Sequence, residues 1–179
     1  LSGGYKYAQT GEGACFLYSP PKINYRPVNT GWFASFEELE SYVKEGSVID
    51  YADGGYRFWG ATFDPSGLYR FNAVMDLLEQ EGISIETVDS YVKELQQYFF
   101  ERLSNSDTIP FGKESFLIDD LNNCGHFLCV KHPKAAELQD KLMEKKVFTD
   151  VRGDLLRFGF GMYQDKSDVD ELFERMSQL

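Results

Sequence analysis

Regular hydrophobic spacing in the middle of the chain predicts two consecutive helices. Pro65 suits a first helical turn, and apolar residues then recur at helical intervals up to Gly82. Ser84 is a typical N-cap for a second helix that continues to about Leu103. The apolar stripes comprise Leu68, Phe71, Val74, Met75 and Leu78 in the first helix, and Ile85, Val88, Val92, Leu95 and Phe99 in the second.

The rest of the C-terminal half alternates between short strands and helices. Apolar runs predict strands at 115–118, 126–130, 147–150 and 155–160, and the run 133–145 predicts a helix opened by Pro133. A final helix follows Ser167, which we expect to cap it together with Asp168. This order predicts a compact α+β layer.

The N-terminal part has little regular patterning. Residues 14–18 read as a short buried strand ended by the proline pair at 20–21. A polar helix is expected at 36–44 with Ser35 as its cap, and 20–34 and 46–64 read as loops. We therefore divide the chain into residues 1–66 and a second domain at 67–179.

Composition narrows the class of protein. The chain has 179 residues, 42% of them hydrophobic, and a formal net charge of −11. This length and apolar content predict a folded protein with a real core, and the negative charge disfavours nucleic acid or an anionic membrane as a partner. No apolar run has the length of a membrane span. Three cysteines without a disulfide framework suit a reducing cytoplasm.

The most chemically suggestive stretch is Gly4-Tyr5-Lys6-Tyr7. Glycine allows the backbone to approach a ligand closely. A lysine between two aromatic rings is expected to be partly desolvated, which lowers an ammonium pKa and frees the amine to react with a carbonyl group. The structural alternative is a turn before a strand with a solvated lysine.

This stretch resembles the cofactor-lysine segment of kynureninases. The similarity continues through Gly11-Glu12-Gly13, Phe16-Leu17-Tyr18, Gly31-Trp32-Phe33 and Arg57-Phe58 with Gly60-Ala61-Thr62. The resemblance implies that Lys6 binds pyridoxal 5'-phosphate covalently and that Tyr5, Trp32 and Thr62 contact its phosphate. Ala61 and the Phe63-Asp64-Pro65 segment depart from the family's usual Gly-Thr-Pro-Pro, which weakens the assignment of Thr62. Without the family, Trp32 would read as an ordinary core aromatic.

A second segment, 147–160, is similar to the family's Asp-x-Arg-x-x-x-Leu-Arg-Phe-Gly signature. The resemblance implies that Arg157 binds the substrate α-carboxylate, and a guanidinium fork matches that planar group. Arg157 lies among apolar residues, where an unpaired charge is costly. The alternative is a structural ion pair with Asp150 or Asp154. Arg152 is expected to brace the turn.

The resemblance implies the C-terminal part of a fold-type I pyridoxal-phosphate enzyme of the α/β class, within the class V aminotransferase group. Residues 1–66 would end the large cofactor-binding domain, and 67–179 would form a bridging helix and the small domain. We expect the C-terminal half of a longer cytoplasmic protein, a homodimer when complete and inactive as this piece alone. The expected reaction, a step of tryptophan catabolism, hydrolyses kynurenine to anthranilate and alanine.

Two alternatives remain, one within enzymes and one outside them. The same lysine and arginine suit a class V aminotransferase, or a desulfurase or epimerase relative. A desulfurase also needs a mobile cysteine nucleophile, and Cys124 and Cys129 lie in or beside a predicted strand. Outside enzymes, the chain could be a degenerate homologue that works as a binding or structural subunit without catalysis. No metal site is expected, because the spacing of Cys124, His126, Cys129 and His132 fits no common zinc pattern.

Overall fold

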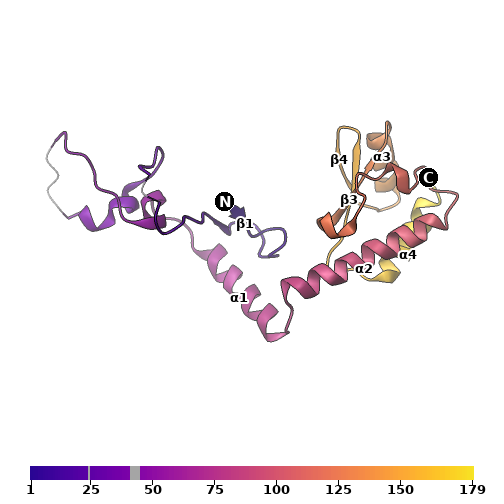
Figure 1. The fold of residues 1–179 in the computed structure, drawn as a ribbon, viewed down its shortest axis with the longest axis horizontal. Coiled ribbons are helices and arrows are strands. Elements are labelled where there is room, and N and C mark those ends of the chain that lie inside the picture. The colour runs from indigo at the N-terminus through magenta and orange to yellow at the C-terminus, as the bar shows by residue number, and fades with distance from the viewer. Residues whose placement is uncertain (24, 41–44) are drawn as a thin grey trace. The chain divides into compact units, whose positions relative to one another are not determined.

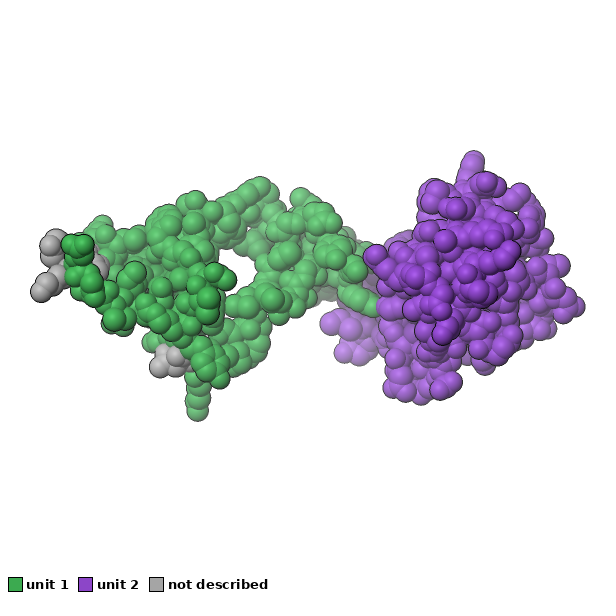
Figure 2. Space-filling model, turned by 90° about the horizontal axis from the view of Figure 1, so that it is seen from above, with its two compact units in different colours: residues 1–82 green, residues 83–179 purple. Residues whose placement is uncertain are grey.

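The computed structural model describes residues 1–23, 25–40 and 45–179. The chain forms two compact units, Leu1–Gly82 and Ile83–Leu179 (Figures 1 and 2), which we call the N-terminal and C-terminal units. The predicted boundary at 66/67 differs from this division, because helix α1, Ser66–Gln80, belongs to the N-terminal unit. The assignment of 1–66 to a larger cofactor domain stays a prediction.

Helix α2, Ile85–Ser104, is the longest element of the C-terminal unit, and its predicted cap is confirmed. The Ser84 hydroxyl accepts a hydrogen bond from the Thr87 backbone N–H. The predicted apolar stripe is buried from Val92 through Phe99, whereas Ile85 is exposed. A hydrophobic stripe thus commits most of this helix to the core.

The sheet of the C-terminal unit is antiparallel, with the order β3-β5-β4. Its strands are β3, Phe127–Lys131, β4, Asp150–Arg152, and β5, Leu155–Gly159. Helices α3, Ala135–Glu144, and α4, Lys166–Met176, complete the unit, with short 3₁₀ turns at Lys113–Ser115 and Leu121–Asn123. The mixed helix-and-sheet prediction is confirmed; the fold-type I assignment stays a prediction.

The hydrophobic core lies between this sheet and the helices. Phe99 is fully buried and its ring contacts five others, those of Phe100, Phe116, Phe158, Phe160 and Phe173. Leu128 and Val130 of β3 and Leu156 and Phe158 of β5 join the same cluster. Because strand side chains alternate, the residues between them, including Cys129 and Arg157, face the opposite side of the sheet.

The N-terminal unit is built mostly from loops. Besides α1, it contains a two-residue pair of strands, β1, Ser2–Gly3, and β2, Cys15–Phe16, and two 3₁₀ segments, η1, Trp32–Glu38, and η2, Gly54–Phe58. The predicted strand at 14–18 is thus only two residues long. Of the apolar side chains described in this unit, only Ala14 and Ala34 are buried.

Several predicted boundaries are wrong. A 3₁₀ segment replaces the start of the expected 36–44 helix, whose residues 41–44 lie outside the described part of the chain, and the Ser35 hydroxyl donates to the Asp50 carbonyl instead of capping a helix. Only an isolated bridge from Phe116 to Val130 forms in the predicted 115–118 strand. Asp165, not Ser167, caps α4, in a capping box with Asp168. Among the described residues, no helix is long and apolar enough to span a membrane.

Candidate functional site

Lys6 lies at the tip of a short loop whose base is tightly closed. The Gly4 N–H donates to the Ala14 carbonyl at 2.7 Å, and the Thr10 N–H and hydroxyl both donate to the Gly4 carbonyl at 2.9 Å. Thr10 is fully buried, and a Cβ on Gly4 would overlap its hydroxyl. The Gln9 N–H donates to the Lys6 carbonyl at 2.9 Å. Backbone closure therefore fixes where the lysine is presented.

The side chain of Lys6 is exposed in this structure. Its Nζ lies 5.4 Å from the centroid of the Tyr5 ring, and Tyr5 and Tyr7 are themselves about half or more exposed. The predicted desolvation by two aromatic neighbours is therefore not present, because neither ring covers the amine. No ion pair with Lys6 occurs among the described residues, so the amine is accessible to a ligand.

Helix α1 supports the other side of this loop. The Phe16 and Phe71 rings meet edge to face with centroids 6.3 Å apart, and Arg70 Nη1 reaches the Glu12 carbonyl at 3.5 Å. These contacts connect β2 and the glycine-rich turn to the exposed face of the helix. The helix is thus the scaffold that orients the base of the lysine loop.

The segments that carry Trp32 and Thr62 run beside each other. The Gly31 N–H donates to the Trp59 carbonyl and the Phe33 N–H donates to the Gly60 carbonyl, at 3.2 and 3.1 Å. A Cβ on Gly31 would overlap the Gly60 carbonyl, so glycine is needed for this approach. Trp32 is 47% exposed and not the core aromatic of the structural alternative. Thr62 is also exposed. Two predicted phosphate contacts therefore come from adjoining backbone segments.

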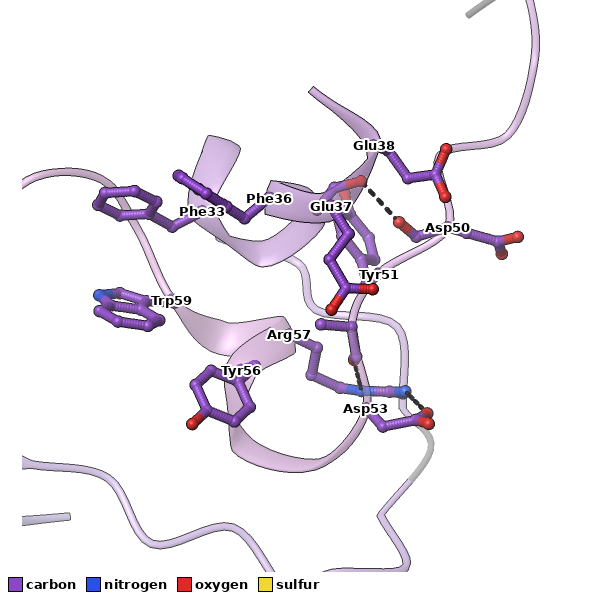
Figure 3. Close-up of a pocket in the computed structure, with 12 residues that line it drawn as sticks. Phe33, Phe36, Glu37, Glu38, Asp50, Tyr51, Asp53, Tyr56, Arg57 and Trp59 are labelled. Atoms are coloured by element: carbon purple, nitrogen blue, oxygen red, sulfur yellow. Dashed lines mark hydrogen bonds and ion pairs between the residues drawn. The ribbon is translucent and has the colours of Figure 1, made fainter. Parts of the chain in front are cut away.

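A pocket of about 980 Å³ lies beside these segments in the N-terminal unit (Figure 3). Aromatic rings of Phe33, Phe36 and Trp59 form one side, with Phe33 and Trp59 centroids 5.2 Å apart. The opposite side carries carboxylates, those of Glu37, Glu38, Asp50 and Asp53. Four carboxylates disfavour a phosphate group, and none of the predicted site residues lines the pocket. We do not place the cofactor there.

Arg57 is the buried residue that sequence reasoning did not assign. Its Nε donates to the Ala52 carbonyl at 3.2 Å and its Nη1 to the Tyr25 carbonyl at 3.1 Å, while Nη2 lies 3.6 Å from Asp53 Oδ1. It thus fastens the backbone at Tyr25 to the 52–57 segment, and Figure 3 shows its pair with Asp53. The sequence feature that could indicate this role is an arginine in a loop-rich region with few aliphatic residues, since its several N–H groups can donate to backbone carbonyls.

Arg157 lies in β5 on the side of the sheet away from the core. It forms an ion pair with Asp150 of β4, and its guanidinium lies 5.6 Å from the centroid of the Phe127 ring. Asp154 pairs instead with Lys131, at 3.7 Å. Arg157 Nε is buried without a hydrogen-bond partner in the described part of the chain. The ion-pair alternative is therefore observed with Asp150, and binding of a substrate carboxylate by Arg157 stays a prediction.

The two cysteines of the C-terminal unit, Cys124 and Cys129, are poorly suited to act as nucleophiles. Burial raises the pKa of the Cys124 thiol, and burial likewise raises the pKa of Cys129 despite the neighbouring Arg157 charge. A raised pKa reduces the thiolate fraction at neutral pH. This agrees with the sequence argument against a desulfurase.

The chemistry of the N-terminal donor set fits a phosphorylated aldehyde. An accessible primary amine at Lys6 can bond to a carbonyl carbon, and the Tyr5 and Thr62 hydroxyls and the Trp32 indole N–H are donors that a phosphate accepts. The structure describes the lysine loop and the Trp32 segment within one unit. Arg157 belongs to the other unit.

Comparison with known protein families assigns the C-terminal unit. Residues 90–176 match the family model described as the kynureninase C-terminal domain. This range contains most of α2, the whole β3-β5-β4 sheet, and both Asp150 and Arg157. A search of curated proteins finds no match. The family model thus confirms the resemblance over the range it covers, and residues 90–176 are similar to the kynureninase C-terminal domain.

Proposed function

We propose that this chain is part of a pyridoxal-phosphate enzyme that hydrolyses the Cβ–Cγ bond of kynurenine and releases anthranilate and alanine. The observation that carries the proposal is the match of residues 90–176 to the kynureninase C-terminal domain. The fold-type I assignment, the homodimer and a cytoplasmic location belong to the same proposal. The three free cysteines support the location.

Lys6 is the proposed covalent anchor and proton carrier. Its exposed amine would hold the cofactor through the aldehyde group, and the same amine, when free, would remove the proton from the substrate Cα. When bound, pyridoxal phosphate supplies an electron sink for the negative charge that develops at Cα. Closure of the loop by Gly4 and Thr10 keeps the amine in place through both roles.

Tyr5, Trp32 and Thr62 are the proposed phosphate donors. In the resembled family the tryptophan and threonine reach the phosphate held by the opposite subunit, so we propose that Trp32 and Thr62 act across a two-fold interface. Their exposure in this chain supports that role, because both side chains are accessible to a second subunit. The adjoining backbone of 31–33 and 59–60 presents them from one place.

Arg157 is the proposed anchor for the substrate α-carboxylate. Its buried Nε has no hydrogen-bond partner in the described ranges of the chain, and an unmade buried hydrogen bond costs about 1–3 kcal/mol. A substrate carboxylate supplies the missing acceptor, with the charge-assisted bonds typical of arginine and carboxylate. Such a contact would hold the substrate by its α-carboxylate.

The test is an assay of the natural polypeptide that carries these residues, with pyridoxal phosphate and kynurenine. We expect anthranilate fluorescence to rise with one alanine formed per anthranilate, and no turnover from the 179-residue chain by itself. Amino transfer to an added oxo acid without anthranilate would contradict the hydrolase and favour a class V aminotransferase. Turnover by the isolated chain would overturn the proposed need for further residues.

A second candidate is a degenerate homologue without catalysis. The observation that favours it is the ion pair in which Asp150 already occupies the guanidinium of Arg157. In that case neither kynurenine cleavage nor amino transfer would be measured, and Lys6 would carry no cofactor. The unpaired Arg157 Nε and the accessible Lys6 amine argue for the enzyme instead.

A further inference from the structure

We infer that Asp150 is a positioning residue that holds the Arg157 guanidinium for the substrate carboxylate, so that the ion pair is part of the binding site. This inference rests on the proposed function. It concerns the face of the β3-β5-β4 sheet that lies away from the hydrophobic core.

The sheet register places the two residues directly opposite each other. Asp150 of β4 pairs with Arg157 of β5, and Arg157 pairs on its other side with Cys129 of β3. Directly opposed residues of antiparallel strands have their side chains on one face and close together. The register therefore fixes Asp150 beside the arginine, and no loop conformation is needed to bring them together.

Two contacts restrain the guanidinium from different sides. Arg157 Nη2 pairs with Asp150 Oδ2, while the Phe127 ring of β3 lies 5.6 Å from the guanidinium carbon. Together they hold a long side chain that would otherwise sample many rotamers, an entropy that binding would have to overcome. Nε is buried and has no hydrogen-bond partner among the residues that the structure describes.

The ion pair does not abolish the attraction for an anion. Arg152 also approaches Asp150, with Nε 3.7 Å from Oδ2. Two guanidinium groups and one carboxylate leave one net positive charge at this end of the sheet, while Lys131 and Asp154 neutralise each other nearby. A single carboxylate shared by two arginines can therefore orient Arg157 without cancelling the charge that a substrate meets.

The matched control is Asp154 in the same β4–β5 hairpin. Asp154→Asn also removes one carboxylate charge, but Asp154 pairs with Lys131 and not with Arg157. Asp150→Asn keeps the shape of the side chain and removes its charge, and Asp150→Glu restores the charge one methylene further out. Because Asp150 is about half exposed, none of these changes opens a cavity in the core.

The experiment measures kcat and KM for kynurenine in the natural polypeptide loaded with pyridoxal phosphate. We expect Asp150→Asn to raise KM about tenfold with kcat changed less than about threefold, since a contact made equally in ground and transition states is lost. Asp150→Glu should recover part of the KM, and Asp154→Asn should leave both constants unchanged. Such a split, with rescue by glutamate, would not arise from a general loss of folded protein.

The outcomes separate this inference from the function on which it rests. A wild-type protein without kynurenine cleavage contradicts the proposed function and the inference with it. An active wild type in which Asp150→Asn and Asp154→Asn behave alike overturns the inference alone. A lower KM in Asp150→Asn also overturns it, because Asp150 would then be a competitor of the substrate and not its support.

Discussion

The two units of this chain hold their chemistry in opposite ways. In the C-terminal unit, a cluster of buried aromatic and aliphatic side chains fixes the sheet, and the sheet register then fixes Arg157 and Asp150. Almost none of the apolar side chains described in the N-terminal unit is buried. Backbone hydrogen bonds, the buried Thr10 and the buried Arg57 position its loops instead. Packing orients the proposed carboxylate site, whereas polar closure orients the lysine.

This difference predicts where each unit tolerates substitutions. In a close-packed core each side chain is held by its neighbours, so the loss of one ring destabilises the whole unit. A loop closed by hydrogen bonds depends on a few backbone approaches and leaves its aromatic residues accessible. Exposed rings such as Trp32 and Phe36 are then available for ligands or a second subunit.

The largest effect is expected when the chemistry of the N-terminal unit is removed without changing its fold. Lys6→Ala should lower the rate of anthranilate formation by on the order of 10³-fold or more, because both the covalent anchor and the Cα base are lost. Lys22→Ala, a change at another exposed lysine of the same unit, is the matched control. Equal rates for Lys6→Ala and wild type would exclude Lys6 from catalysis.

The next largest effect is expected on stability, when a buried ring of the C-terminal unit is removed and compared with an exposed ring of the N-terminal unit. Phe99→Ala should lower the free energy of unfolding of the C-terminal unit by about 3–5 kcal/mol, since a fully buried ring leaves a cavity. Phe36→Ala should change the free energy of unfolding of the N-terminal unit by no more than about 0.5 kcal/mol, because that ring is exposed. Urea unfolding followed by far-UV circular dichroism measures both.

Tryptophan fluorescence sharpens the same experiment. Both tryptophans, Trp32 and Trp59, belong to the N-terminal unit, so fluorescence reports on that unit alone. We expect Phe99→Ala to shift the dichroism transition to a lower urea concentration more than the fluorescence transition. Two transitions that shift together by the same amount would show that the units unfold as one.

A smaller effect is expected at the backbone approach of the N-terminal unit. Gly31→Ala should destabilise that unit by about 1–3 kcal/mol, because the added methyl overlaps the Gly60 carbonyl. Gly60→Ala is the control, since a Cβ there meets nothing within 4 Å. Hydrogen exchange of the backbone amides of residues 31 and 33 measures the loss of stability in each variant. Equal protection of these amides in the two variants would contradict the close approach.

The smallest effect is expected at the cap of α4. Hydrogen bonds from Ser167 and the Asp168 backbone hold the Asp165 pKa below its ordinary value of 3.8. A carboxylate with a lowered folded pKa contributes stability that is present above the unfolded value and lost as pH falls through the folded value. The difference in melting temperature between wild type and Asp165→Asn should therefore narrow from pH 6 to pH 3. A constant difference would mean that charge plays no part in the cap.

The sequence predicts those parts of the fold in which one strong local signal dominates. Helix α2 follows from its apolar period and from Ser84, and both are confirmed. The Ser35 cap fails because its hydroxyl bonds to the distant Asp50 carbonyl, which no local pattern reveals. The α4 cap is displaced by two residues because Asp165 and Asp168 form a complete capping box, a stronger arrangement than Ser167 alone.

The candidate site follows the same division. The Lys6 motif can be recognised in the sequence, but the exposure of the Lys6 side chain cannot be predicted from it, because solvation depends on which segments cover the amine. The sequence limits the partner of Arg157 to Asp150 or Asp154, and only the register of β4 against β5 selects Asp150. Arg57 was not assigned a role because its partners are carbonyls of separate loops.

The most direct test of the central claim is borohydride reduction of the natively purified polypeptide, followed by peptide mass mapping across residues 1–22. The account predicts a phosphopyridoxyl adduct on Lys6 and an unmodified Lys22. An unmodified Lys6 in the natural polypeptide supplied with pyridoxal phosphate, or an adduct confined to other lysines, would contradict the proposal that this loop holds the cofactor.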